Sequence, residues 1–396
     1  MRLPSLRTVL FWSHLTAGVM AGVAILIMSL TGVLLMYERQ LIEWSDRQFY
    51  GEPPSAAERL PIEALLTRAQ AQRPGPAPTA ITLRSDVSAP AAVAFGQTTA
   101  YFDAYSGVLL GEPTTDVRWL MSRLRAWHRW MALDGDNRPL GKAISGWSNA
   151  AFFFIVLSGM YLWIPRRWNW SSVRAVVMFK GGLRGKARDF NWHNVVGIWS
   201  AVPLAIVVAT AMPISFSWAN ALVYKLVGES VPAAGGGGEG ANRPGAEANR
   251  RRATPSFDGV NTLWATAERQ APGWRTINLR LPNSSDAPAV FAIDAGTGGQ
   301  PQFRSTLTLD PLTGDVVRWE TFADQSLGRR LRSWSRFTHT GEYYGIAGQT
   351  IAGLASAGGT VLVWTGVALA WRRFRAWALA GTRVLNPRSD RATEAA

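Results

Sequence analysis

Four histidines are the residues of this sequence best suited to hold a metal, and each lies just ahead of a long apolar run. They are His14, His128, His193 and His339, in a chain of 396 residues without cysteine. The lack of cysteine excludes disulfides, thiolate metal sites and cysteine-ligated iron–sulfur clusters. An imidazole at a membrane boundary is costly unless another group satisfies it, so these positions favour a functional role.

The histidines follow an internal repeat. In the first pattern, a glycine and a threonine follow a histidine by 4 and 17 residues. In the second pattern, four residues follow a glycine by 3, 5, 17 and 18 residues. The copies of the first are His14, Gly18 and Thr31, and His193, Gly197 and Thr210. The copies of the second are Gly141, Ile144, Gly146, Ser158 and Gly159, and Gly348, Ile351, Gly353, Thr365 and Gly366. We therefore interpret the chain as one unit used twice.

Four apolar runs are long enough to cross a membrane as helices. They are residues 17–36, 143–164, 194–224 and 346–371, and none contains Asp, Glu, Lys or Arg. About 20 helical residues cross the hydrocarbon of a bilayer. The first run follows a basic start but lacks an Ala-x-Ala cleavage site, so we interpret it as an uncleaved anchor rather than a signal peptide.

Positive charge predicts which side of the membrane each loop faces. The net charge is +14, and basic residues gather before the first run, between the second and third, and after the fourth. They are Arg2 and Arg7; Arg166, Arg167, Arg174, Lys180, Arg184, Lys186 and Arg188; and Arg372, Arg373 and Arg375. By the positive-inside rule these residues and both termini are cytoplasmic, which places residues 38–142 and 225–345 in the periplasm of a Gram-negative cell. We expect a multi-pass protein of the bacterial inner membrane, in contact with lipid.

The two outer segments resemble each other as well. "YFDAYSGVLLG" at 101–111 and "TLDPLTGDVVRW" at 308–319 both predict a strand, a turn and a second strand, and a short helical pattern precedes each. The fold class predicted is a membrane α-helical protein, with four transmembrane helices as a tandem repeat and a small outer α+β module in each half. Residues 232–255 are of low complexity and are predicted to be disordered. The expected segments are helix 1–37, outer module 38–142 with a membrane-proximal helix, helix 143–165, basic loop 166–190, helix 191–224, second outer module 225–345, helix 346–371 and cytoplasmic tail 372–396.

Pairing one histidine from each repeat gives one pair per membrane face. His14 would meet His193 at the cytoplasmic face, and His128 would meet His339 at the outer face. Two facing imidazoles in a helix bundle can hold haem iron from both sides, and without cysteine the haem would be b-type. We therefore predict two haem b groups with these four histidines as axial iron ligands, and small residues such as Gly18 to leave room for each porphyrin. The alternative is that the histidines are interfacial residues of the aromatic belt.

Other functions find little support in the sequence. Four histidines on two faces do not converge on one zinc ion, and the sequence has no HExxH, no GxGxxG after a strand and no serine elbow. No side chain is predicted to be catalytic, and Asp103 and Asp310 are interpreted as turn initiators. The basic residues follow the membrane topology, so we expect no nucleic-acid partner. An anionic ligand could be attracted by the outer arginines Arg123, Arg125, Arg329, Arg330, Arg332 and Arg336.

The chain resembles the PepSY-associated transmembrane family. The resemblance rests on "WSHLTAGVMAGVAILIMSLTGVLL", "WHRW", "LGKAISG", "LSGMYLWIPRR", "NWHNVVGIWSAVPLAIVV", "THTGEYYGIAGQTIAGL" and "TGVALAWRR", in that order. It implies a bacterial inner-membrane protein with periplasmic PepSY-like modules. Some members are similar to siderophore-iron reductases, which implies haem on the positions of His14, His128, His193 and His339.

Together with the four histidines, this resemblance implies a haem-dependent ferric reductase. Electrons would pass from a cytoplasmic or quinol donor across the membrane to a periplasmic ferric siderophore or another ferric chelate, and so serve iron acquisition. A second possibility is a non-enzymatic, membrane-anchored PepSY protein that binds or regulates a partner. A third, a transporter, is disfavoured because the repeats are parallel and the spans have no central acid or base.

Overall fold

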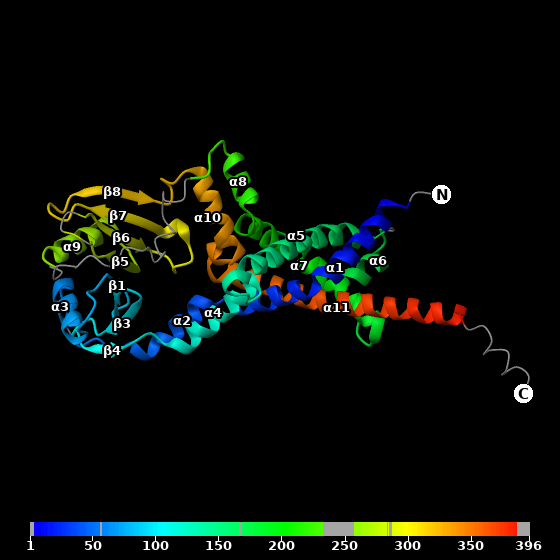
Figure 1. Ribbon diagram of the computed structural model, residues 1–396, viewed down its shortest axis with the longest axis horizontal. Helices are drawn as coiled ribbons and strands as arrows, with labels where there is room; N and C mark the ends of the chain where they lie inside the picture. Colours follow the sequence, from blue (N-terminus) through cyan, green and yellow to red (C-terminus); the bar gives the residue numbers. More distant parts are fainter. Residues whose placement is uncertain are drawn as a thin grey trace, which may run out of the picture.

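The computed structural model describes residues 4–55, 58–165, 168–232, 257–282, 284 and 287–385. A bundle of long helices forms one end of the molecule and a β-sheet with its own helices forms the other (Figure 1). Apart from Pro232, the segment predicted to be disordered lies outside the described residues, as do Arg166, Arg167 and residues 386–396. Both ends of the described chain lie at the end of the bundle away from the sheet (Figure 1).

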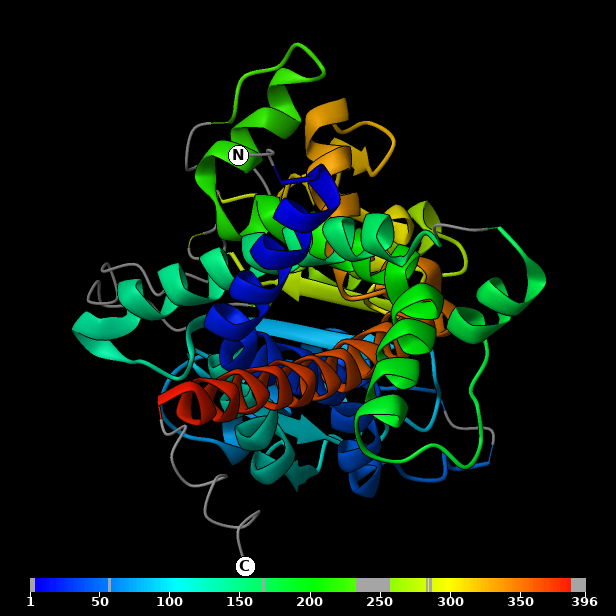
Figure 2. The same ribbon diagram turned by 90° about the vertical axis from the view of Figure 1, so that its right-hand side faces the viewer.

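Among the described residues, four helices are long and apolar enough to cross a membrane, as the sequence predicts. They are α1 (Leu6–Leu35), α5 (Arg138–Trp163), α7 (Gly185–Ser215) and α11 (Gly345–Leu385). Helices α1 and α7 each pack against both α5 and α11 (Figure 2). The centre of the bundle is an apolar cluster of Ile25, Phe152, Val156, Leu204, Val208 and Ala355.

Two spans differ in extent from their apolar runs. The third begins at Gly185 and ends at Ser215, because Phe216 is extended and a separate helix, α8 (Ser217–Lys225), follows. The fourth span continues to Leu385, so Arg372, Arg373 and Arg375 lie on α11 and not in a separate tail.

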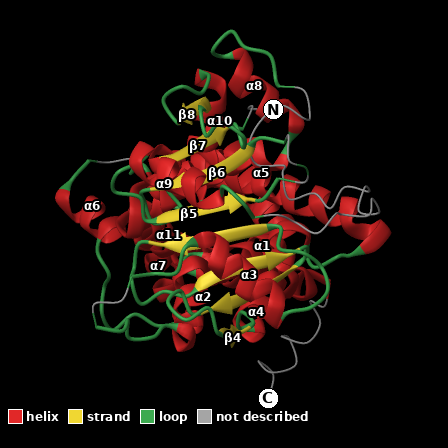
Figure 3. Ribbon diagram, turned by 90° about the vertical axis from the view of Figure 1, so that its left-hand side faces the viewer, coloured by secondary structure: helices red, strands yellow, loops and turns green. Residues whose placement is uncertain are grey.

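The strands of both outer segments join in one antiparallel sheet of eight strands, in the order β4-β3-β2-β1-β5-β6-β7-β8 (Figure 3). Each half of the chain contributes four strands, and the halves meet where β1 pairs with β5, for example Ile81 with Leu279. The strands are β1 (Ala80–Arg84), β2 (Ala91–Phe95), β3 (Thr98–Phe102), β4 (Leu109–Gly111), β5 (Thr276–Arg280), β6 (Ala289–Asp294), β7 (Arg304–Leu309) and β8 (Val316–Thr321).

Alternate residues of the central strands are buried, as expected for a sheet covered on one face. Helices α3 (Ile62–Gln72) and α9 (Val260–Gln270) supply the cover, one from each half. Fully buried side chains of this second core include Leu66, Phe102 and Phe291.

The carboxylates of Asp103 and Asp310 accept backbone N–H bonds two and three residues ahead, which confirms their role as turn initiators.

Short helices connect the sheet with the bundle. In the first half they are α2 (Glu38–Asp46), the 3-10 turn Arg47–Phe49 and α4 (Thr115–Trp130), which is followed by a 3-10 turn at Gly135–Asn137. In the second half they are α10 (Leu327–His339) and the 3-10 turn Glu342–Tyr344. Helix α4 packs on α1 and α5, and α10 packs on α7 and α8. The remaining elements are α6 (Trp170–Val177) and the 3-10 turn Pro301–Phe303.

Candidate functional site

The structure arranges the four histidines as two pairs at two levels of the bundle. His128 and His339 are in the last turns of α4 and α10, at the end of the bundle nearer the sheet, and we call them the sheet-side pair. Their ring centroids are 6.1 Å apart, with 49° between the ring planes. His14 in α1 and His193 in α7 lie at the other level, and we call them the tail-side pair. The approach of His128 to His339 is the one that the repeat predicts.

The two tail-side rings have matching surroundings. Nδ1 of His14 lies 2.9 Å from the hydroxyl of Ser158 on α5. Nδ1 of His193 lies 2.9 Å from the hydroxyl of Thr365 on α11. Ser158 and Thr365 occupy equivalent positions of the sequence repeat, so each half of the bundle holds one ring in the same way.

The two sheet-side rings are fixed by different acceptors. Nδ1 of His128 lies 3.0 Å from the hydroxyl of Thr31, whereas Nδ1 of His339 lies 2.9 Å from the backbone carbonyl of Val207. Burial, reinforced by the neighbouring His339, lowers the pKa of His128 to about 4, and burial also lowers the pKa of His339. Both imidazoles are therefore neutral at neutral pH, which is the form that binds metal ions.

The hydrogen bonds identify which nitrogen of each ring carries the proton. The hydroxyl of Thr31 donates its only hydrogen to the carbonyl of Ile27, so it can only accept a bond from Nδ1–H of His128. A carbonyl also only accepts, so Nδ1 of His339 is protonated too. The hydroxyls of Ser158 and Thr365 likewise donate their hydrogens to the carbonyls of Ile155 and Val361. Each hydroxyl can therefore only accept a bond from its histidine, so Nδ1 of both tail-side rings is protonated as well. In all four histidines Nε2 keeps its lone pair, and no hydrogen bond to it is found among the described residues.

Three of the rings lie directly against a glycine that follows the hydroxyl residue. A Cβ at each of these glycines would come within 3.3 or 3.4 Å of the ring's Cε1. The glycine and histidine partners are Gly159 with His14, Gly366 with His193, and Gly32 with His128. The fourth ring is the exception, because Ala211 follows Thr210 at the equivalent place and His339 bonds to Val207.

The sequence suggested that small residues near the histidines leave room for a flat ligand. One of them, Gly18, lies one helical turn from His14. No atom lies within 4 Å of the position that its Cβ would take, so space is open beside this ring. Gly197 is different, since a Cβ there would meet Leu362 at 3.6 Å. Gly18 therefore meets the expectation better than Gly197 does.

Two further glycines bring the sheet-side helices back onto the spans. A Cβ on Gly141 would overlap the carbonyl oxygen of Trp130, and a Cβ on Gly348 would overlap that of Gly341. Trp130 and Gly341 each follow a sheet-side histidine by two residues. The close contact at both places fixes where the helix that carries the histidine turns into the next span.

A buried ion pair connects the sheet with the helix of His128. Asp46 at the end of α2 is 4% exposed and accepts two bonds from Arg118 of α4, at 2.8 and 2.6 Å. Tyr101 of β3 donates to the same carboxylate at 2.8 Å. Burial and the adjacent carboxylate raise the pKa of Tyr101 to about 12. Although burial opposes it, bonding to Arg118 and Tyr101 lowers the pKa of Asp46 below its ordinary value.

The six arginines expected near the outer histidines lie on α4 and α10. Arg125 forms an ion pair with Glu38, and Arg329 lies 3.7 Å from Glu320. Arg129, which the sequence did not single out, follows His128 directly, and its pKa is lowered by desolvation and by the charges of Arg336, Arg138 and Arg125.

Sequence reasoning missed the groups that orient the histidines. The positions of Thr31, Ser158 and Thr365 were recognised as repeat matches, but not as hydrogen-bond partners. The repeat itself was the available signal, because a hydroxyl residue and a glycine recur at the same offsets. The carbonyl of Val207 left no signal, since any residue supplies a backbone acceptor.

The fold and the site together define a class: a multi-pass membrane protein with an extramembrane β-sheet and two pairs of half-buried histidines. The family model for the PepSY-associated TM region matches residues 11–373, and the chain belongs to this family. No curated protein matches the sequence. Among the described residues, no group of three or more His, Asp or Glu side chains could hold a metal ion.

Proposed function

We propose that the chain is an oxidoreductase with two haem b groups, one held by His14 and His193 and the other by His128 and His339. One observation carries the proposal: four histidines form two pairs, and each has Nδ1–H donated and Nε2 free. A histidine that binds a metal commonly donates its other ring N–H to a fixed acceptor. The pairs therefore have the orientation of ligands and not of interfacial residues that point to water.

The residues present fit a bis-histidine haem. A metal–imidazole bond is about 2 Å long, so two rings that bind one ion from opposite sides have centroids about 6 Å apart. The 6.1 Å between the rings of His128 and His339 agrees with this spacing. The open space at Gly18 provides room for a flat ring system beside His14.

The protein's own residues would set the position and the environment of each group. Thr31, Ser158, Thr365 and the carbonyl of Val207 keep the imidazoles in the ligating tautomer and increase their basicity. The apolar cluster around Ile25 and Phe152 excludes water from the middle of the bundle. Bound haem would supply one-electron transfer, the chemistry that the chain itself lacks.

We propose a periplasmic ferric chelate as electron acceptor and a quinol or a cytoplasmic reductant as donor. A quinol releases two electrons and two protons, and reduces two Fe(III) ions to Fe(II) by one electron each. Reduction favours release of the iron, because oxygen ligands hold Fe(II) more weakly than Fe(III). The basic residues at the tail-side end, such as Lys180, Arg184 and Arg372, support an orientation with the sheet in the periplasm and both termini in the cytoplasm of a bacterial inner membrane.

The architecture supports a tandem arrangement, in which each half contributes two spans, one sheet helix and four strands of a PepSY-like module. In this arrangement α1 corresponds to α7 and α5 to α11. The equivalent hydroxyls on α5 and α11 support this correspondence.

A second candidate function is that of an anchored binding protein. The edge strands β4 and β8 expose apolar side chains, with Leu109 at 38%, Val316 at 47% and Val317 at 63%. Exposed apolar residues on unpaired strand edges are suited to bind an added strand of a partner. This function predicts a protein without a chromophore that is insensitive to histidine substitution.

Reduced-minus-oxidised absorption spectra of the protein purified from haem-replete cells test the proposal. We expect a b-type spectrum and about two haems per chain by pyridine haemochrome. His14→Ala and His193→Ala should lose the same haem, and His128→Ala and His339→Ala the other. A His14→Ala variant that keeps both haems would disprove the pairing, and a colourless wild type would favour the binding protein.

A further inference from the structure

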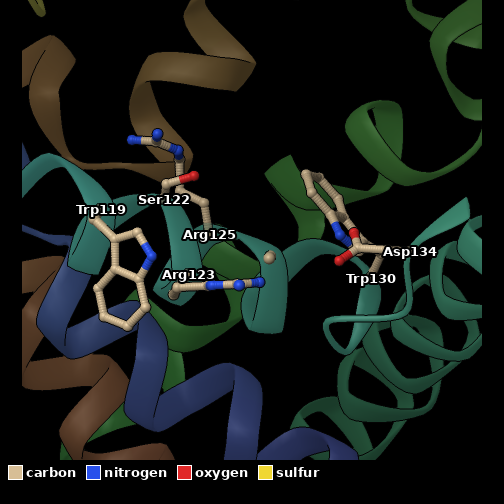
Figure 4. Close-up of a pocket in the computed structure, with 7 residues that line it drawn as sticks. Trp119, Ser122, Arg123, Arg125, Trp130 and Asp134 are labelled. Carbon is tan, nitrogen blue, oxygen red and sulfur yellow. The ribbon is translucent and has the colours of Figure 1, made fainter.

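A cavity of about 400 Å³ lies along α4, on the sheet side of the bundle. Trp119 is on one side, Trp130 and Asp134 are on the other, and Arg123 lies between them (Figure 4). Arg125 also lines the cavity and lies three residues before His128, less than one helical turn away. Trp119, Arg123, Ala126 and Trp130 recur every three or four residues, so the cavity lies along one face of α4, while His128 projects from the other face of the same helix. An α-helix with its side chains is about 10–12 Å across, and the cavity volume is within the range of small-ligand sites.

Basic residues outnumber acidic ones in and around this cavity, which is lined by Arg123, by Asp134 and by Arg125, the last paired with Glu38. The guanidinium of Arg123 lies 5.6 Å from the ring centroid of Trp119, and no carboxylate pairs with it among the described residues. Arg129 and Arg138 lie over the ring of Trp130, at 5.3 and 4.2 Å from its centroid. Stacking on tryptophan holds guanidinium groups in place without neutralising them.

Hydrogen-bond donors also exceed acceptors here. Nε1 of Trp130 is buried and has no hydrogen-bond partner among the described residues. Ser122 and Arg123 offer further donors, whereas Asp134 is the lining carboxylate. A buried donor without an acceptor is unfavourable, so the cavity is complementary to a ligand that brings several acceptor oxygens.

We propose that this cavity binds the electron acceptor, and that the acceptor is an anionic ferric chelate of the polycarboxylate class. This inference rests on the proposed function and names its substrate class. Carboxylate oxygens match the planar donor fork of arginine, and Arg123 is the lining arginine that no carboxylate of the described residues pairs with. The same positive walls repel cationic hydroxamate chelates, so charge selects between the two classes.

Binding of Ga(III)–citrate to the full-length protein in phosphatidylcholine nanodiscs tests the inference. Ga(III) resembles Fe(III) in charge and size but is not reduced, so this assay does not require haem or electron transfer. Binding is measured by equilibrium dialysis and by quenching of tryptophan fluorescence, to which Trp119 and Trp130 contribute. We expect saturable binding that weakens with increasing salt.

The variant Arg123→Gln should weaken binding by about tenfold or more, because it removes a charge-assisted contact. The matched control is Arg318→Gln, since Arg318 is an exposed arginine of β8 distant from the cavity. The control should bind as the wild type does, and the cationic Ga(III) complex of desferrioxamine B should not compete.

Three results would overturn the inference. One is equal binding by the wild type and Arg123→Gln, and another is equal or tighter binding of the cationic complex. The third is loss of citrate binding in phosphatidylglycerol nanodiscs, which would assign the cavity to a lipid headgroup. Failure of the proposed function is distinguishable from all three, because it would appear as a protein without haem that still binds Ga(III)–citrate.

Discussion

The hydroxyl of Thr365 lies 2.9 Å from Nδ1 of His193 and donates to the carbonyl of Val361. The hydroxyl therefore accepts a bond from the imidazole and leaves Nε2 of His193 available to a ligand. Ser158 holds His14 in the same way on the equivalent helix. The two halves of the bundle thus use one device to orient two rings that are far apart in the sequence.

Replacing Thr365 with Val tests this device. Valine keeps the shape but removes the acceptor, so the ring of His193 loses its fixed orientation and tautomer. We expect haem affinity of the tail-side pair to fall by about 10- to 100-fold, with a shift in its midpoint potential. Haem titration and redox potentiometry of the purified variant measure both effects.

Thr360→Val is the matched control, because Thr360 lies on the same helix and its hydroxyl bonds, within the described part of the chain, to the carbonyl of Ser356 alone. It should retain wild-type haem affinity. Equal behaviour of the two variants would show that the hydroxyl of Thr365 does not act through His193.

Gly18→Leu tests the open space beside His14. No atom lies within 4 Å of the added Cβ, so the variant should fold with a stability change within about 0.5 kcal/mol. The leucine side chain would occupy the space assigned to a porphyrin, and we expect loss of the tail-side haem with retention of the other. Haem content and thermal unfolding are measured together.

The control for this variant is Gly51→Leu, at an equally open position whose backbone bonds to Ser88 at the sheet end of the molecule. It should keep both haems. A Gly18→Leu protein with two haems per chain would refute the assignment of this space.

Gly348→Ala tests the close turn after His339. The new Cβ would overlap the carbonyl oxygen of Gly341, and backbone atoms cannot move aside as a side chain can. We expect destabilisation by about 1–3 kcal/mol and weaker haem binding at the sheet-side pair. Gly353→Ala, five residues further on, is the control because its Cβ meets only the flexible side chain of Met36, at 3.4 Å.

Much of the bundle could be predicted from the sequence, because apolar length and positive charge are local signals. The four spans and the approach of His128 to His339 followed from the runs and from the repeat. The end of α7 at Ser215 did not, since the residues after Phe216 remain apolar and hydropathy alone cannot separate one helix from two.

The union of both modules in one sheet could not be predicted from either module alone. The pairing of β1 with β5 joins residues almost 200 positions apart, such as Ile81 and Leu279, and leaves no local pattern. The partners of the histidines were hidden for a related reason. The repeat marked Thr365 as equivalent to Ser158, but only the packing of α7 on α11 shows that Thr365 reaches His193.

Asp46→Asn tests the ion pair between the sheet and α4. The substitution removes the carboxylate charge that pairs with Arg118, which should destabilise the protein by about 2 kcal/mol and shift the potential of the sheet-side haem more than that of the tail-side haem. The pKa of Asp46 is lowered in the folded state, so the pair stabilises the fold above about pH 4, and this contribution is lost as pH falls through the folded pKa. The stability of the wild type, measured by thermal unfolding, should therefore fall more steeply in acid than that of Asp46→Asn.

The control Glu43→Gln breaks the exposed ion pair between Glu43, 51% exposed, and Arg84, 38% exposed. It should change stability by less than about 0.5 kcal/mol. Equal effects of the two substitutions would contradict a special role for the buried pair.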